Sequence, residues 1–418
     1  MTHVLGFLAF AILPLFGLAV WPAVRNAPWT TRIAVAGVAG SLVVGAVMIA
    51  MSALHIQWSR TSVWIALLLI VAATLRRFSL AGAAPPQSHW ITAAIVLFVF
   101  LSLYGALTAR QTSPDLFYFW GSKAVRFFRN GGVTLAFLRA PDSLALHRDY
   151  PPFLSVMYAW SQIVAAHYSV WAVLLVTPLA LAAIAAIVRG FSGDGMGTLL
   201  VVATMAHGMA VGCVGGAAEG PLLLFEALTL VAIVFIDDWR AGTLLGAIGA
   251  IGATAMKVEG ATFVIAVVLA IVVVKRDLRR AAWIAAPAAA VFLGWLLFTQ
   301  RTGIAEIQPL LARFPFRFAM IPRVLELLAK PASYGIWGVS WLIPIVLIIL
   351  GRLRPAALPL AIAALTLAVT IFFYSRGTDP WWWITVSADR VLLTPLLALD
   401  IAAVAAWREA KARAVPRE

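Results

Sequence analysis

The residue types needed for acid–base and phosphate chemistry occur together in residues 114–128, which read PDLFYFWGSKAVRFF. Asp115, Lys123 and Arg126 place an acid, a lysine and an arginine among aromatic residues, and such groups can exchange protons or bind anions. Each such charge costs about 2.5–3.5 kcal/mol at the centre of a membrane helix. In an apolar chain these residues therefore indicate either a membrane interface or a functional site.

Further segments repeat this mixture of charges, aromatic residues and turn-forming residues. They are HRDYPPF at 147–153, with Arg148, Asp149 and Tyr150; AAEGPLLLFEAL, with Glu219; ATAMKVEGATF, with Lys257 and Glu259; and WWWITVSADRVLL, with Arg390. A guanidinium group suits bidentate binding of a phosphate, which makes Arg390 a candidate for that role. The segments are separated by apolar runs, so the folded chain must bring them together for any shared chemistry.

Each segment also has a purely structural interpretation. Asp115 and Glu219 can cap helix N-termini, and residues 115–129 can form an amphipathic helix lying on the membrane surface. Helical spacing lets Asp115, Trp120 and Lys123 share part of one helix surface. The 147–153 segment can be a plain turn, and Lys257 with Glu259 can be a pair that snorkels to an interface. The tryptophans at 381–383 are typical of an aromatic belt.

Composition identifies the elements that must position these residues. The 418-residue chain is 63% hydrophobic and 11% charged, whereas soluble domains are about 45–50% apolar and about 25% charged. We therefore expect an all-α, polytopic integral membrane protein. The net charge of +14 comes from basic residues scattered at the ends of apolar runs, which favours membrane lipids and lipid phosphates as partners and argues against nucleic acid. With Cys213 as the sole cysteine, no intramolecular disulfide can form.

Apolar runs of suitable length predict a bundle of about 13 transmembrane helices. The expected spans are at about residues 3–24, 33–54, 60–75, 90–109, 169–189, 197–214, 219–236, 241–256, 259–275, 281–299, 334–350, 355–374 and 389–407. The basic residues fall on one side if 150–167 forms a re-entrant or interfacial helix pair that does not cross. The first apolar run lacks a basic n-region, so we interpret it as a retained span and not as a signal peptide.

The order of the charged segments resembles the GT-C superfamily of membrane glycosyltransferases that use polyprenyl-phosphate sugars. The family pattern has an acid soon after an early span, a YPP or HPP element, an acid that opens a later span, a KNEG element and an arginine at the last span. The matching residues are Asp115, Tyr150-Pro151-Pro152, Glu219, Lys257-Val258-Glu259-Gly260 and Arg390. The resemblance covers residues 90–407 and implies a GT-C-like bundle with interfacial helices in the first long external loop.

This resemblance implies a division of the chain and a set of roles. Residues 1–89 would add N-terminal transmembrane helices, 90–299 would form the catalytic core with external loop 110–168, and 300–418 would supply an external loop and the C-terminal helices. Asp115 would be the general base, and the donor phosphate would be bound by Lys257 and Arg390, with Lys123 and Arg148 in reserve. Residues expected to bind the sugar or the acceptor are Asp149, Tyr150, Glu219, Glu259 and Trp120. Because the first loop carries a single acid at this position, we expect no metal cofactor.

The implied reaction moves a sugar from a polyprenyl-phosphate donor to a lipid, glycan or protein hydroxyl, with inversion at the anomeric carbon. The expected location is the bacterial inner membrane, with the site facing the periplasm. A transporter or flippase of lipid-linked glycan intermediates is the main alternative. Transporters typically show repeated halves with broken helices at the membrane midplane, and no such repeat stands out here. A scaffold subunit without catalysis is a third interpretation.

Overall fold

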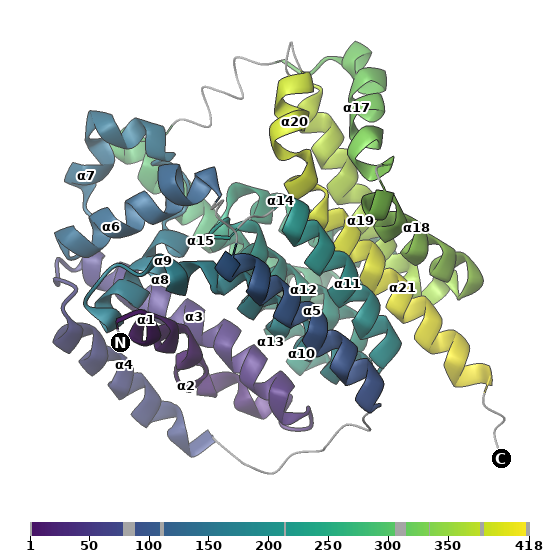
Figure 1. Ribbon diagram of the computed structural model, residues 1–418, viewed down its shortest axis with the longest axis horizontal. Helices are drawn as coiled ribbons and strands as arrows, with labels where there is room; N and C mark the ends of the chain where they lie inside the picture. The colour runs from purple at the N-terminus through teal and green to yellow at the C-terminus, as the bar shows by residue number, and fades with distance from the viewer. Residues whose placement is uncertain are drawn as a thin grey trace.

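The structure is a computed structural model, and it describes residues 2–77, 88–108, 113–212, 215–305, 315–333, 335–376 and 380–414. It is 86% helical, and the residues it describes contain no strand. The expectation of an all-α protein is confirmed. Figure 1 shows helices of the N-terminal half on the left and in the centre, with the C-terminal helices packed along their right-hand side.

The N-terminal helices are α1 (Thr2–Ala11), α2 (Leu13–Phe16), α3 (Trp29–Ala53), α4 (Arg60–Thr74) and α5 (His89–Thr108), with a 3₁₀ segment at Leu18–Val24 after α2. Helix α2 packs on α3, whereas α5 packs against α10 (Val176–Ser192) and α11 (Gly195–Gly212) of the central group. A Cβ on Gly40 of α3 would lie 1.8 Å from the carbonyl oxygen of Leu13. Glycine at this position therefore lets α2 and α3 approach backbone to backbone.

Short elements follow α5 and form the region between the first helices and the bundle. They are a π-helical turn (Leu116–Trp120), α6 (Gly121–Asn130), α7 (Leu135–Arg139), a 3₁₀ turn (Pro141–Leu146) and α8 (Phe153–Ala165). Residues 150–167 were expected to form a re-entrant or interfacial pair. They instead contain one 13-residue helix, α8, whose side chains are almost all buried in the protein. At about 1.5 Å per residue, α8 is too short to cross a bilayer.

The central helices surround α12, which is almost wholly buried. They are α9 (Val170–Leu174), α10 (Val176–Ser192), α11 (Gly195–Gly212), α12 (Glu219–Phe235), α13 (Trp239–Met256), α14 (Val258–Ala270) and α15 (Leu278–Thr302). Helix α12 packs against α10 and α13 and, from the C-terminal part of the chain, against α21. Its first residue, Glu219, is therefore held at the end of a helix that is packed on several sides.

The C-terminal helices are α17 (Ile321–Ser333), α18 (Gly335–Leu350), α19 (Leu353–Tyr374), α20 (Pro380–Val391) and α21 (Leu393–Ala414). Helices α19 and α21 pack extensively on each other, and α14 contacts α19. Figure 1 shows α17 and α20 together at one end of this group, with α18, α19 and α21 running away from them.

By length and apolarity, seven helices can cross a membrane, or up to eight if the bent pair near the N-terminus counts as one span. The seven are Trp29–Ala53, His89–Thr108, Val170–Ser192, Val258–Lys275, Leu278–Thr302, Leu353–Tyr374 and Pro380–Arg413. A multi-pass membrane protein is consistent with this result, whereas the count of about 13 is not confirmed. Of the other expected spans, α4, α12 and α18 have 15 to 17 residues, and at about 1.5 Å per residue they fall short of a hydrocarbon core of about 30 Å. Helices α11 and α13 have 18 residues each and are not among the seven.

Candidate functional site

A cavity of about 410 Å³ lies where the short elements, the bundle and the C-terminal helices meet. Its lining comes from the π-helical turn, the 147–150 segment, the first turn of α12, the junction of α13 with α14, and helices α19, α20 and α21. The ionisable residues in the lining are Asp115, His147, Tyr150, Glu219, Lys257, Glu259, Tyr374 and Arg390. Residues up to 275 positions apart in the chain thus share one cavity of the size typical for small-molecule sites.

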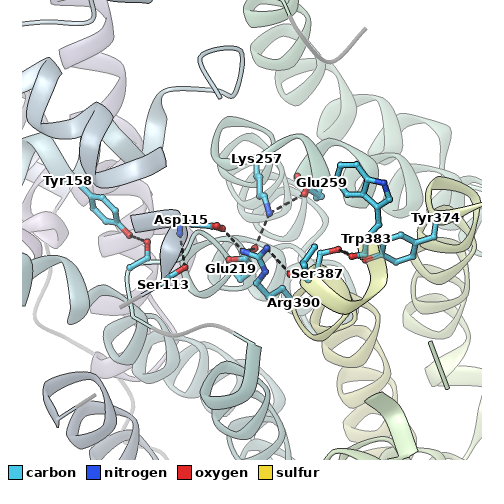
Figure 2. A network of polar contacts seen from close by, with 12 residues as sticks. Ser113, Asp115, Tyr158, Glu219, Lys257, Glu259, Tyr374, Trp383, Ser387 and Arg390 are labelled. Carbon is cyan, nitrogen blue, oxygen red and sulfur yellow. Dashed lines mark hydrogen bonds and ion pairs between the residues drawn. The ribbon is translucent and has the colours of Figure 1, made fainter. Parts of the chain in front are cut away.

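Five of these side chains form a continuous row of alternating charge. Arg390 Nη1 bonds to Asp115 Oδ2 and lies 3.7 Å from Glu219 Oε1. Lys257 Nζ lies 2.9 Å from the same Glu219 oxygen and 3.1 Å from Glu259 Oε1. Figure 2 shows Arg390 between Asp115 and Glu219, with Lys257 bridging Glu219 to Glu259. We call these five residues the charged row.

The break between α13 and α14 positions the lysine of the charged row. Helix α13 ends at Met256, Lys257 is extended with φ −158° and ψ 157°, and α14 begins at Val258. A Cβ on Gly260 would lie 1.9 Å from the carbonyl oxygen of Ala253, so only glycine permits this close helix junction. The Lys257 side chain is only 11% exposed. It turns into the cavity and does not snorkel to an interface.

Asp115 and Glu219 both lie at helix starts, and ion pairing engages both side chains. Asp115 precedes the π-helical turn but its side chain makes no capping hydrogen bond. Its backbone N–H instead donates to Ser113 Oγ at 3.2 Å, and its carboxylate faces Arg390. Glu219 is the first residue of α12, where the helix dipole favours a negative charge. Its side chain is 5% exposed and pairs with Lys257 and Arg390.

Aromatic rings cover one side of the charged row. The ring of His147 lies 4.3 Å from that of Phe119 and 5.2 Å from that of Tyr150, and Tyr150 packs edge-on to Trp120 at 5.7 Å. The ring of His147 is partly open to solvent, and desolvation by its neighbours lowers its pKa, which favours the neutral imidazole. The nearby Glu259 carboxylate and burial raise the pKa of Tyr150, so its phenol keeps its proton. Tyr150 is therefore a hydrogen-bond donor in this site and not an anion.

The structure gathers most of the residues singled out from the sequence. Those that line the cavity are Asp115, Trp120, Tyr150, Glu219, Lys257, Glu259 and Arg390. Trp383 also lines it, whereas Trp381 and Trp382 are about half exposed, as in an aromatic belt.

Lys123, Arg148 and Asp149 are not among the lining residues. Lys123 is buried under the ring of Trp120, 4.8 Å from its centroid, and its Nζ donates to the carbonyl oxygen of His147 at 3.1 Å. Arg148 Nη1 lies 3.5 Å from the carbonyl oxygen of Leu138. Asp149 is buried, and its carbonyl oxygen accepts a 2.7 Å bond from Trp295 Nε1. In this structure the side chains of Lys123 and Arg148 and the main chain of Asp149 tie the loop to its surroundings.

Sequence reasoning missed the hydroxyl residues of the cavity. They are Thr262, Thr366, Thr370, Tyr374, Ser387 and Thr394. Most lie within apolar helices and none carries a charge, so nothing in their local sequence marks them. Thr394 Oγ1 also contacts the buried Glu226, donating to its Oε2 at 2.8 Å. The one available signal was the recurrence of threonine at 366 and 370, which a helix places on one face.

Among the described residues, no group of three or more His, Cys, Asp or Glu side chains is arranged to hold a metal ion. The cavity instead combines carboxylates that can accept a proton with cations that can bind an anion, beside neutral hydroxyls and aromatic rings. No protein-family model, curated protein or solved structure matches the chain.

Proposed function

We propose that the protein is a membrane glycosyltransferase that moves a sugar from a polyprenyl-phosphate donor to an acceptor hydroxyl. The charged row is the observation that supports this most directly. It places a carboxylate, Asp115, next to cations suited to a phosphate, Arg390 and Lys257, in one cavity of a protein rich in apolar helices. Glycosyl transfer from a lipid phosphate needs this combination of a base and a stabilised leaving group.

The proposed reaction is a single displacement with inversion. The acceptor oxygen forms a bond to the anomeric carbon as the bond from that carbon to the phosphate oxygen breaks. Asp115 takes the acceptor proton, and polyprenyl phosphate leaves with the bonding electron pair. Arg390 and Lys257 then face the charge that develops on the leaving phosphate. Asp115 becomes neutral in the same step, which reduces the number of negative charges in the charged row.

The ion pairs suggest how the phosphate of the sugar donor binds to Arg390 and Lys257. Arg390 pairs with Asp115, so the Asp115 carboxylate is engaged by this cation. A donor phosphate gives Arg390 a further anionic partner besides Asp115 and Glu219, and movement of the guanidinium onto it frees Asp115 Oδ2. An ammonium group has three N–H donors; Lys257 donates one to Glu219 and forms an ion pair with Glu259. We assign a further N–H donor of Lys257 to a phosphate oxygen.

The remaining residues take supporting roles. Glu219 lies between both cations and fixes their spacing, and Glu259 holds Lys257 from the other side. Trp120 and Tyr150 form the wall against which a sugar ring can pack. Lys123, Arg148 and Asp149 are assigned to positioning the loop that carries His147 and Tyr150. We place the site on the external face of a bacterial inner membrane, where a lipid-linked donor is presented.

The test is a transfer assay in proteoliposomes. Purified protein is given undecaprenyl-phosphate glucose, galactose or mannose with a labelled sugar, and membrane glycolipids and glycans serve as acceptors. We expect the label to move covalently to an acceptor with release of undecaprenyl phosphate. Movement of intact donor across the bilayer without covalent transfer would reject the proposal in favour of a flippase. Neither transfer nor movement for any donor would reject it as well.

A further inference from the structure

The hydroxyl groups that line the cavity share one hydrogen-bonding feature. On α19, Thr366 Oγ1 donates to the carbonyl oxygen of Ile362 at 2.9 Å, and Thr370 Oγ1 donates to that of Thr366 at 3.0 Å. On α14, Thr262 Oγ1 donates to the carbonyl oxygen of Glu259 at 2.7 Å. A hydroxyl has a single proton, so these oxygens have only lone pairs left for the cavity.

The hydroxyls of α20 and α21 behave in the same way. Ser387 Oγ donates to the carbonyl oxygen of Trp383 at 2.7 Å. Tyr374 Oη lies 2.7 Å from Ser387 Oγ, and because the serine proton is already used, the tyrosine supplies the proton of that bond. Thr394 Oγ1 donates to Oε2 of Glu226, whose side chain is fully buried.

These bonds separate the described cavity lining into hydrogen-bond acceptors and hydrogen-bond donors. Apart from Tyr150, every hydroxyl that lines it has its proton engaged and offers only acceptor lone pairs. The strong donors are Lys257 and Arg390 of the charged row. In Figure 2, Tyr374 and Ser387 lie on the right of Arg390, whereas Asp115 lies on its left. We call Thr262, Thr366, Thr370, Tyr374, Ser387 and Thr394 the hydroxyl wall.

We propose that the hydroxyl wall is a sugar subsite that recognises ligand hydroxyls solely as hydrogen-bond donors. This inference rests on the proposed function, and it specifies the groups of the sugar donor that the cavity recognises. The ligand has a phosphate that accepts bonds from Lys257 and Arg390, and a polyhydroxylated ring whose O–H groups donate to the wall. Glu226 acts as a positioning residue, because its bond from Thr394 fixes the direction in which that hydroxyl presents its lone pairs.

An acceptor-only surface makes an unusual prediction for sugar analogues. Replacing a ligand hydroxyl with hydrogen removes a hydrogen bond and leaves a wall oxygen unpaired. Replacing it with fluorine also removes the proton, and in addition sets fluorine lone pairs against oxygen lone pairs. The affinity order is therefore hydroxyl, then deoxy, then deoxyfluoro. A wall that donated protons would bind the fluoro compound at least as well as the deoxy compound.

The experiment measures binding by calorimetric titration of the detergent-solubilised full chain. The probes are citronellyl phosphate, its glucose, galactose and mannose esters, and the monodeoxy and monodeoxyfluoro forms of each ester. For the best-bound sugar we expect at least one position where the deoxy form binds about tenfold more weakly, with the fluoro form weaker still. Thr370→Val or Thr394→Val should reduce this discrimination, and Thr394→Ser should keep it.

Thr385→Val is the matched control. The Thr385 hydroxyl also donates to a carbonyl one turn back, that of Trp381 at 2.7 Å, but Thr385 does not line the cavity. It should leave the affinity order unchanged.

The inference is overturned if the deoxyfluoro forms bind as well as or better than the deoxy forms at every position. It is also overturned if neither Thr370→Val nor Thr394→Val alters the affinity order of the hydroxyl, deoxy and deoxyfluoro compounds. Sugar esters that bind no better than citronellyl phosphate would also overturn it, while leaving the phosphate site of the proposed function intact. If no probe binds, including citronellyl phosphate, the proposed function fails and this inference fails with it.

Discussion

Two arginine–aspartate pairs of the same chemistry lie in different surroundings. Arg126 and Asp142 meet at 3.3 Å with more than half of each side chain exposed. Arg390 and Asp115 are 20% and 15% exposed, and their contact continues through Glu219 and Lys257 to Glu259. Exposed pairs contribute little because water solvates the separated charges equally well. Buried charges cost much more to desolvate, so the charged row is the arrangement that calls for a functional explanation.

The largest expected effect separates buried from exposed lysines. Lys257→Met leaves the carboxylates of Glu219 and Glu259 without their shared cation, and we expect a loss of about 3–5 kcal/mol in the free energy of unfolding. Lys330→Met removes an exposed pair with Glu326 and should cost less than about 1 kcal/mol. Equilibrium unfolding in mixed detergent micelles measures both. Equal losses in the free energy of unfolding for the two variants would show that Lys257 contributes no more to stability than an exposed lysine.

The next effect tests whether the guanidinium fork of Arg390 matters. Arg390→Lys keeps the charge but removes bidentate geometry, so we expect the affinity for citronellyl phosphate to fall about tenfold. Arg323→Lys alters an exposed arginine paired with Glu326 and should leave this affinity unchanged. Calorimetric titration gives both values. If Arg390→Lys bound citronellyl phosphate as tightly as the natural chain, the guanidinium group of Arg390 would not be part of the phosphate site.

A smaller effect concerns pH. Because partial desolvation lowers the pKa of His147 below 6.5, the folded protein takes up this proton less readily than the unfolded chain. Stability attributable to neutral His147 is therefore complete above pH 6.5 and is lost as the pH falls from 6.5 through the lowered native pKa. Because part of the ring faces solvent, which screens the charge, we expect this loss of stability to be small.

Unfolding measured from pH 7.5 to 5 should show less acid destabilisation in His147→Gln than in the natural chain. A pH profile in His147→Gln identical to that of the natural chain would show that protonation of His147 does not affect stability.

The smallest effect is expected at the exposed pair itself. A double-mutant cycle with Arg126→Ala and Asp142→Ala should give a coupling of about 0.2–1 kcal/mol, which high salt should reduce further. Thermal unfolding of the four proteins provides this value. A coupling above about 2 kcal/mol would show that exposure does not distinguish this pair from the pair in the cavity.

The sequence revealed the charged row because charges at the ends of apolar runs are conspicuous and costly. It misjudged the surroundings of Lys123 for a geometric reason. The π-helical turn at Leu116–Trp120 interrupts α-helical spacing, so Trp120 lines the cavity while Lys123 lies beneath it and bonds to His147. No local pattern in LFYFW marks that turn.

The hydroxyl wall could not be predicted for a different reason. Thr366 and Thr370 lie within a long apolar helix, where threonine commonly bonds to its own backbone and faces any direction. Their role depends on which face of α19 meets α14, and tertiary packing alone decides that. The expected number of spans is likewise not confirmed, because apolar composition does not reveal where helices such as α12 and α13 end, at Phe235 and Met256.

The most direct test of the central claim is single-turnover sugar transfer by Asp115→Asn, with Asp142→Asn as the matched control. Asparagine preserves the size of the side chain but cannot take the acceptor proton, so we predict that Asp115→Asn lowers the transfer rate by about 10²–10⁴-fold. Asp142→Asn should transfer at the natural rate. Near-normal turnover by Asp115→Asn, with donor still bound, would contradict the assignment of Asp115 as the base.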